Sequence, residues 1–160
     1  MKINARHRYK CSIDELYALF TSKKYYAKKY AACGARNIEI LRVEQTDEGF
    51  VVQSRREVPA DVPGVLKSFL GDWNTIVQNE NWDGDPGEEY YNDFEISAEG
   101  VPVKMVGTMN VMPDGDGCVN DVEIEITCAI PLLGKKLAEF VASDAKKTLA
   151  AEYEFTLTQV

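Results

Sequence analysis

The sequence lacks the features that mark a secreted or membrane-spanning chain. No uninterrupted apolar run approaches the roughly 18 residues that a membrane span needs. The N-terminal segment Met1-Lys2-Ile3-Asn4 leads into alternating basic residues and has no apolar signal-peptide core. We therefore expect a cytoplasmic protein without an integral membrane segment.

Metal-ligating residues and cofactor motifs are also scarce. The chain has one histidine and four cysteines, and no two cysteines stand in a Cys-x-x-Cys spacing. A zinc site needs ligands at a recognisable spacing, so we expect no metal. The segment Asp114-Gly115-Asp116-Gly117 is similar to a calcium loop, but position 118 is Cys rather than an acidic residue, which favours a hairpin turn. Phosphate loops, dinucleotide fingerprints and nucleophile elbows are missing, and we expect no cofactor.

Basic residues become rare after residue 42. Residues 1–42 hold ten Lys and Arg against three Asp and Glu, whereas Lys104 is the only basic residue between Asp72 and Glu125. The net charge is −8, which argues against nucleic-acid binding because phosphate neutralisation needs a basic footprint. The acidic run is either a solvated sheet face or one pole of a dipole that orients a partner. The lysines of residues 23–29 are either a solvated helix face or a transient contact with anionic membrane lipids.

The apolar periodicity predicts an α+β fold. Residues 2–10 alternate as a half-buried strand does, and Ser12 and Glu15 have the spacing of a capping box. From Ala35 the period is two, and the short turns between segments require antiparallel neighbours. The longest helical pattern follows Pro131. The expected elements are a strand over 2–10, helices over 13–21 and 23–33, strands over 36–45, 49–58, 74–82, 88–98, 102–112 and 118–130, and a helix over 132–154.

The inward face of the last helix is rich in small residues. With Val141 at its centre, the 100° helical step places on this face Gly134, Leu137, Ala138, Ala145 and Thr148. Such a face leaves volume beneath a long sheet, and an empty volume costs roughly 24 cal/mol per Å³. We therefore expect a cavity that a ligand occupies. The alternative is that aromatic and methionine side chains fill the space as ordinary core.

The stretch 59–71 interrupts the run of strands and is bounded by Pro and Gly. Its apolar residues have the spacing of a short amphipathic helix. We expect this stretch to form a lid at the entrance of the cavity. The candidate lid residues are Val62, Pro63, Leu66 and Phe69.

Several motifs in order carry a resemblance to a known superfamily. They are Val58-Pro59-Ala60-Asp61, Asn81-Trp82, Pro113-Asp114-Gly115-Asp116-Gly117, Ile130-Pro131-Leu132-Leu133-Gly134-Lys135-Lys136-Leu137 and Ala150-Ala151-Glu152-Tyr153-Glu154-Phe155. Across essentially the whole chain they resemble the bacterial family known as domain of unknown function 2505, in the START and birch-pollen-allergen (Bet v-like, SRPBCC) superfamily. The resemblance implies a helix-grip fold, β-α-α-β6-α, in which a bent seven-stranded antiparallel sheet wraps around a long C-terminal helix. It further implies one START-like ligand-binding domain over residues 1–160, with a cavity that holds apolar molecules in relatives.

The function we expect is binding or transport of one small hydrophobic or amphipathic, lipid-like ligand in that cavity. A cyclase or dehydratase is the first alternative, with His7 or Asp144 moving a proton in a dry pocket, although we assign no catalytic residue. A protein-interaction module that uses the acidic sheet face is the second. A buried carboxylate at Asp144 or Glu152 would need a partner. The candidate ligand-binding residues are His7, Trp82, Tyr91, Phe94, Met105, Met109, Leu137, Val141, Asp144, Ala145 and Thr148.

Overall fold

Seven strands form one antiparallel sheet in the order β1-β7-β6-β5-β4-β3-β2. The computed structural model describes the backbone of residues 1–160 and every side chain except that of Phe69. The predicted element order and the helix-grip architecture are confirmed. The strands are β1 (Lys2–Tyr9), β2 (Arg36–Gln45), β3 (Phe50–Pro59), β4 (Trp73–Gly84), β5 (Tyr90–Ala98), β6 (Val103–Asp114) and β7 (Gly117–Cys128). The helices are α1 (Ile13–Phe20), α2 (Lys23–Ala32), the 3₁₀ turn η1 (Gly64–Leu66), α3 (Lys67–Leu70) and α4 (Gly134–Leu157).

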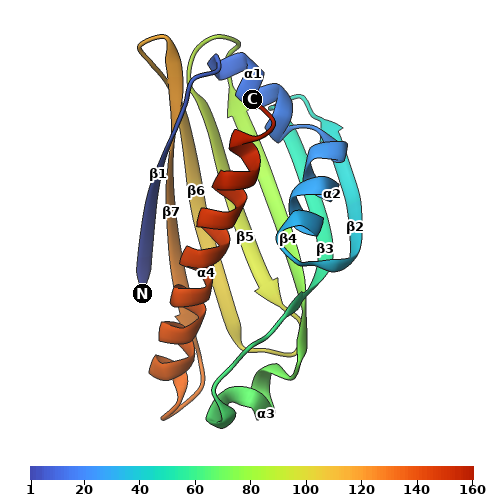
Figure 1. The fold of residues 1–160 in the computed structure, drawn as a ribbon, viewed down its shortest axis with the longest axis vertical. Helices are drawn as coiled ribbons and strands as arrows, with labels where there is room; N and C mark the ends of the chain where they lie inside the picture. Colours follow the sequence, from blue (N-terminus) through green and yellow to red (C-terminus); the bar gives the residue numbers. More distant parts are fainter.

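The main helices cover one face of the sheet, which we call the inner face. Figure 1 shows α4 running the length of this face, with α1 and α2 beside its C-terminal half. Helix α4 contacts β1, β7 and α2, and α2 contacts the edge strand β2. The short helix α3 lies near the opposite end, close to the start of α4 (Figure 1). The space between α4 and the middle strands is therefore walled by sheet on one side and by helices on the other.

Local sequence explains where the two N-terminal helices begin. The Ser12 hydroxyl accepts a hydrogen bond from the Glu15 backbone N–H at 3.2 Å, and the Glu15 carboxylate accepts one from the Ser12 N–H at 3.0 Å. This is the predicted capping box, which satisfies two N–H groups that have no partner inside the helix. Ser22 caps α2 in the same position, accepting from the Tyr25 N–H at 3.4 Å. Each of these two helices thus begins at a serine cap.

Two apolar clusters make up the core. One lies beneath α1 and α2 and is rich in aromatic side chains, among them Phe20, Tyr26 and Trp82. The other lies beneath α4, where Leu137 is fully buried against the inner face of β7. Met109 packs against both clusters. The core is therefore continuous along the sheet but changes from aromatic to aliphatic from one end to the other.

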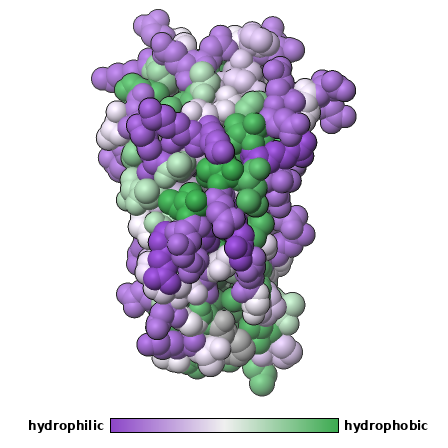
Figure 2. All heavy atoms as spheres, turned by 90° about the vertical axis from the view of Figure 1, so that its right-hand side faces the viewer, coloured by the Kyte–Doolittle hydropathy of each residue, from purple (hydrophilic) through white to green (hydrophobic). Residues whose placement is uncertain are grey.

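The basic and acidic runs of the sequence meet on the outer face. Strand β1 pairs with β7, and this pairing brings Arg6 to Asp121 at 3.1 Å and Lys2 to Glu123 at 3.5 Å. At the other edge of the sheet, charged residues line β2, as is common on strands that must not pair with another chain. Figure 2 looks at this side and shows polar side chains surrounding an apolar island in its upper half. The ion pairs between β1 and β7 thus partly neutralise the charge asymmetry of the sequence within the sheet.

The last helix starts later than the sequence pattern predicts. It begins at Gly134 rather than near residue 132, because Leu132 has a φ of 66° and its side chain is fully exposed. A residue in this left-handed conformation cannot belong to a right-handed helix. At the other end α4 continues through Leu157, where Thr156 is buried against α2.

Candidate functional site

Two adjoining hollows lie between the inner face of the sheet and α4. The larger has a volume of about 200 Å³ and the smaller about 30 Å³. Met109, Leu149 and Glu152 line both, so these three side chains form the wall between them. The other residues around the larger hollow are Tyr30, Cys33, Ala35, Arg56, Val58, Pro59, Ile76, Gln78, Phe94, Ile96, Met105, Ile124, Val141, Asp144, Ala145 and Thr148.

The larger hollow exists because α4 presents short side chains to long strands. Ala145 and Thr148 face it from the helix, whereas Ile96 and Met105 face it from the sheet and are only half-buried. Its exposed lining residues are Pro59, Asp144 and Thr148, which places its opening between the end of β3 and α4. An enclosed empty cavity costs roughly 24 cal/mol per Å³, whereas this hollow opens to solvent and can admit water or a ligand.

A buried carboxylate stands where the aromatic end of the core meets the hollows. Glu80 on β4 is 2% exposed, and its carboxylate accepts four hydrogen bonds. Tyr26 donates at 2.7 Å, and burial together with the Glu80 charge raises the pKa of this tyrosine well above its usual range, so its hydroxyl keeps the proton it donates. The other donors are Gln78 at 2.7 Å, Trp82 at 3.0 Å and Asn92 at 3.3 Å.

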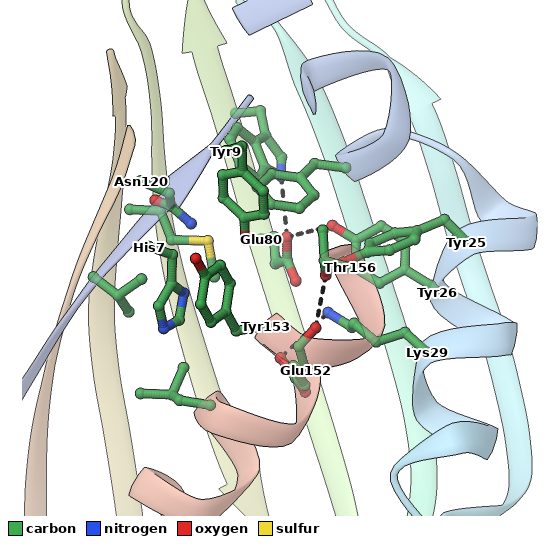
Figure 3. Close-up of a pocket in the computed structure, with 15 residues that line it drawn as sticks. His7, Tyr9, Tyr25, Tyr26, Lys29, Glu80, Asn120, Glu152, Tyr153 and Thr156 are labelled. Atoms are coloured by element: carbon green, nitrogen blue, oxygen red, sulfur yellow. Dashed lines mark hydrogen bonds and ion pairs between the residues drawn. The ribbon is translucent and has the colours of Figure 1, made fainter. Parts of the chain in front are cut away.

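Lys29 is enclosed rather than solvated, which corrects the prediction that the lysines of α2 all lie on an exposed face. Its side chain is 7% exposed, and its Nζ lies 3.4 Å from a carboxylate oxygen of Glu152 on α4. Figure 3 shows the two side chains pointing at each other across the gap between their helices. The rings of Tyr25, Tyr26 and Tyr30 surround the same Nζ at 5.3, 4.9 and 5.0 Å. Burial is the largest single effect and acts to lower the pKa of Lys29, but the attractions of Glu152, Tyr25, Tyr30 and Glu80 together outweigh it and hold the pKa above its usual range.

This pair gives Glu152 the partner that a buried carboxylate needs. The end of α4 is tied to α2 a second time, because the hydroxyls of Tyr25 and Thr156 are 2.6 Å apart. Thr156 also donates to the Glu152 carbonyl at 2.7 Å. These contacts fix the C-terminal half of α4 against α2.

His7 lies on the inner face of β1, as predicted, and lines the smaller hollow. Its ring stacks on that of Tyr153 with the centroids 4.2 Å apart and an angle of 6° between the planes, an arrangement visible in Figure 3. Burial lowers the pKa of His7, and the Glu152 charge opposes this only in part. The imidazole is therefore predominantly neutral near pH 7.

The structure distributes the predicted ligand-binding residues over several places. Seven of them line the larger hollow, namely Phe94, Met105, Met109, Val141, Asp144, Ala145 and Thr148. His7 and Trp82 line the smaller one. Leu137 is packed in the core and lines neither hollow. Tyr91 corrects the prediction, because it is 44% exposed on the outer face while its neighbour Tyr90 points inward and is 4% exposed.

The predicted lid residues lie at the α3 end of the molecule. Leu66 is buried, Val62 packs partly against the cluster beneath α4, and Pro63 is exposed. The side chain of Phe69 lies outside the described residues. Of the stretch 59–71, Pro59 lines the larger hollow. That the stretch 59–71 acts as a lid over the hollow stays a prediction.

The sequence reasoning missed three buried polar residues, Arg56, Gln78 and Glu80. Each stands on the same strand phase as an inward apolar neighbour, with Gln78 and Glu80 preceding Trp82 at intervals of two. Strand alternation alone could have found them, since residues i and i+2 share a face. The charge or polarity of these three side chains favoured the solvent-facing side of the sheet instead.

The groups named for the enzyme alternative do not share a site. His7 lines the smaller hollow and Asp144 the rim of the larger, with Met109 and Leu149 in the wall between. Partial burial raises the pKa of Asp144, and nearby Lys147 counteracts this. Among the described residues there is no group of three or more His, Cys, Asp or Glu side chains placed to hold a metal ion. Within the same residues, no helix is both long and apolar enough to cross a membrane.

Solved structures with the same fold include three that align over nearly the whole chain. The protein TTHA0849 from Thermus thermophilus has a TM-score of 0.68 at 16% identity, covering 99% of each chain. A START superfamily protein from Mycobacterium smegmatis has a TM-score of 0.64 at 13% identity, covering 99% of this chain and 97% of that one. A STAR-related lipid transfer protein from Xanthomonas axonopodis has a TM-score of 0.62 at 15% identity, covering 96% of this chain and 84% of that one. At these identities the likeness shows the fold alone.

Comparison of the sequence with family models identifies the family. A search of curated proteins found no match. The family model described as "Protein of unknown function (DUF2505)" matches residues 4–160. The START-like fold and the predicted family are thus both confirmed, and the chain belongs to the DUF2505 family.

Proposed function

We propose that residues 1–160 act as one binding domain for a small apolar or amphipathic molecule held in the larger hollow between the sheet and α4. The observation that carries this proposal is the hollow of about 200 Å³ whose walls include half-buried Ile96, Met105 and Val141. Apolar side chains that the protein's own packing covers only in part are those that a ligand would cover. The methionine in this wall also favours ligand binding, because its flexible side chain adapts to ligands of different shape.

The similarity to a START superfamily protein and a STAR-related lipid transfer protein supports the same function. The second protein is named for lipid transfer, and we extend to this chain only the binding of a lipid-like molecule. The hollow lies below the roughly 300–1,000 Å³ of drug-sized pockets, which favours a small ligand. The four free cysteines fit a reducing compartment, and we propose the cytoplasm as the site of action.

A cavity-filling substitution tests the proposal. Ala145→Phe places an aromatic ring in the larger hollow, whereas Ala150→Phe places the same ring on the exposed side of the same helix. We expect Ala145→Phe to abolish displacement of a fluorescent fatty acid and Ala150→Phe to preserve it. Native mass spectrometry and solvent extraction of the purified protein would identify any molecule that remains bound. Equal binding by both variants would show that the hollow is not the binding site.

A further inference from the structure

Arg56 is a buried cation that lacks an anionic partner. It stands on the inner face of β3, is 7% exposed, and lines the larger hollow. Its guanidinium carbon lies 3.8 Å from the centre of the Tyr30 ring, and its Nη2 donates to Gln78 Oε1 at 3.0 Å. Its Nη1 is buried and donates to no described group. Among the described side chains, no carboxylate lies within 4 Å of the Arg56 guanidinium.

None of the neighbouring carboxylates pairs directly with Arg56. Gln78 stands between Arg56 and Glu80, and its amide must turn its oxygen to Arg56 and its nitrogen to Glu80, because the guanidinium only donates and the carboxylate accepts. Glu80 therefore reaches Arg56 only through a neutral amide. Glu152 on α4 is paired with Lys29 at 3.4 Å. Asp144 lies at the exposed rim of the hollow.

An unpaired guanidinium in this position is costly. Arginine cannot shed its proton in a protein, so it cannot escape burial by becoming neutral. Buried charges in proteins are accordingly paired, and a guanidinium binds a carboxylate with strong, charge-assisted hydrogen bonds. Nη2 has a partner within the protein and Nη1 has none. Since Arg56 lines the hollow, an acceptor on a molecule bound there would complete the hydrogen bonding of the guanidinium.

We propose that the ligand is a monocarboxylic acid with one compact or medium-length apolar tail, and that its carboxylate accepts a hydrogen bond from Arg56 Nη1. This inference rests on the proposed function and adds the chemical class of the ligand. The volume of the larger hollow limits the size of the ligand's apolar tail. A water-sized group takes about 30 Å³ of liquid volume and at least about 15 Å³ of cavity volume, so about 200 Å³ holds roughly seven to 13 such groups. A two-chain phospholipid is excluded on size.

Isothermal titration calorimetry at pH 7.5 with decanoate, 1-decanol and 3-phenylpropanoate tests the proposal. We expect the wild-type protein to bind decanoate at least about tenfold more tightly than 1-decanol. One hydrogen bond between charged groups contributes an affinity difference of this size. 3-Phenylpropanoate distinguishes an aryl body from a linear tail, because whichever acid binds more tightly identifies the shape that the hollow accepts. Arg56→Met should abolish the preference for the acid and leave 1-decanol binding within about threefold.

Arg55→Met is the matched control, since Arg55 is the next residue of β3 but points outward and pairs with Glu99 at 3.1 Å. It should retain the full preference for the acid. The comparison of ligands on the wild-type protein holds even if Arg56→Met fails to fold. Equal binding of decanoate and 1-decanol would overturn the assignment of an acid and leave the proposed function standing. Binding of none of the three ligands would overturn both.

Discussion

Breaking the ion pair between Lys29 and Glu152 by removing the carboxylate should cost the folded state several kcal/mol. Glu152→Gln removes the carboxylate and leaves the Lys29 ammonium enclosed by three tyrosine rings at 7% exposure. Removing one partner of a buried pair costs about 3–5 kcal/mol, because the other charge stays buried without compensation. Lys29→Met keeps a similar volume but leaves Glu152, which is 19% exposed, and should cost less, about 2–3 kcal/mol.

The double variant with Lys29→Met and Glu152→Gln separates pairing from packing. With both charges removed, neither side chain is left as a buried ion, so we expect the double variant to lose no more than Glu152→Gln alone. The coupling energy of the cycle should therefore be about 2 kcal/mol. The cation–π attraction between the tyrosine rings and Lys29 persists in Glu152→Gln. We therefore expect the cost of this substitution to lie at the lower end of the range, about 3 kcal/mol.

Urea unfolding followed by tryptophan fluorescence measures these free energies, because Trp82 is buried beside Glu80 and reports on the same region. Lys28→Met is the control, since Lys28 is the preceding residue of α2 and is exposed. It should change the free energy of unfolding by less than about 0.5 kcal/mol. A loss below about 1 kcal/mol in Glu152→Gln, or strict additivity of the two single substitutions, would refute the assignment of a buried, coupled pair.

Two further predictions concern the inner face of the sheet. The pKa of His7 is lowered from 6.5, so below pH 6.5 the unfolded chain binds a proton that the folded chain resists, and the free energy of unfolding should fall as the pH drops from 7 toward 5.5. His7→Phe, which can keep the stack on Tyr153, should reduce this decline in urea titrations at several pH values, and an unchanged slope would argue against it. A methyl group at Gly107 would lie 2.4 Å from the ring of Phe94 and 2.6 Å from the Glu123 carbonyl oxygen. Gly107→Ala should therefore lower stability by about 1–3 kcal/mol and shift the melting temperature downward, and a neutral effect would mean that the strand yields easily.

Much of this fold could be predicted because its local signals agree with one another. The capping box at Ser12, the two-residue period after Ala35 and the amphipathic pattern after Pro131 each depend on residues close together in the chain. Short turns then determine the antiparallel pairing. The helix start was misplaced at Leu132 because an apolar residue gives no warning of a positive φ.

The candidate site was only half predictable. Strand alternation placed Met105 and Phe94 on the inner face, and helical spacing placed Ala145 opposite them. The prediction of Tyr91 is wrong, because alternation along β5 places Tyr90, and not Tyr91, on the same face as the inward Phe94.

By itself the sequence determined the order of the elements and the small-residue face of α4, since both follow from spacing along the chain. The tertiary structure decided which polar side chains are buried. Lys29 meets Glu152, and Arg56 meets Gln78, only after α2, α4 and two strands are brought together. It also decided the volume left beneath α4, because a hollow depends on the distance between a helix and a sheet that are joined only through the rest of the fold.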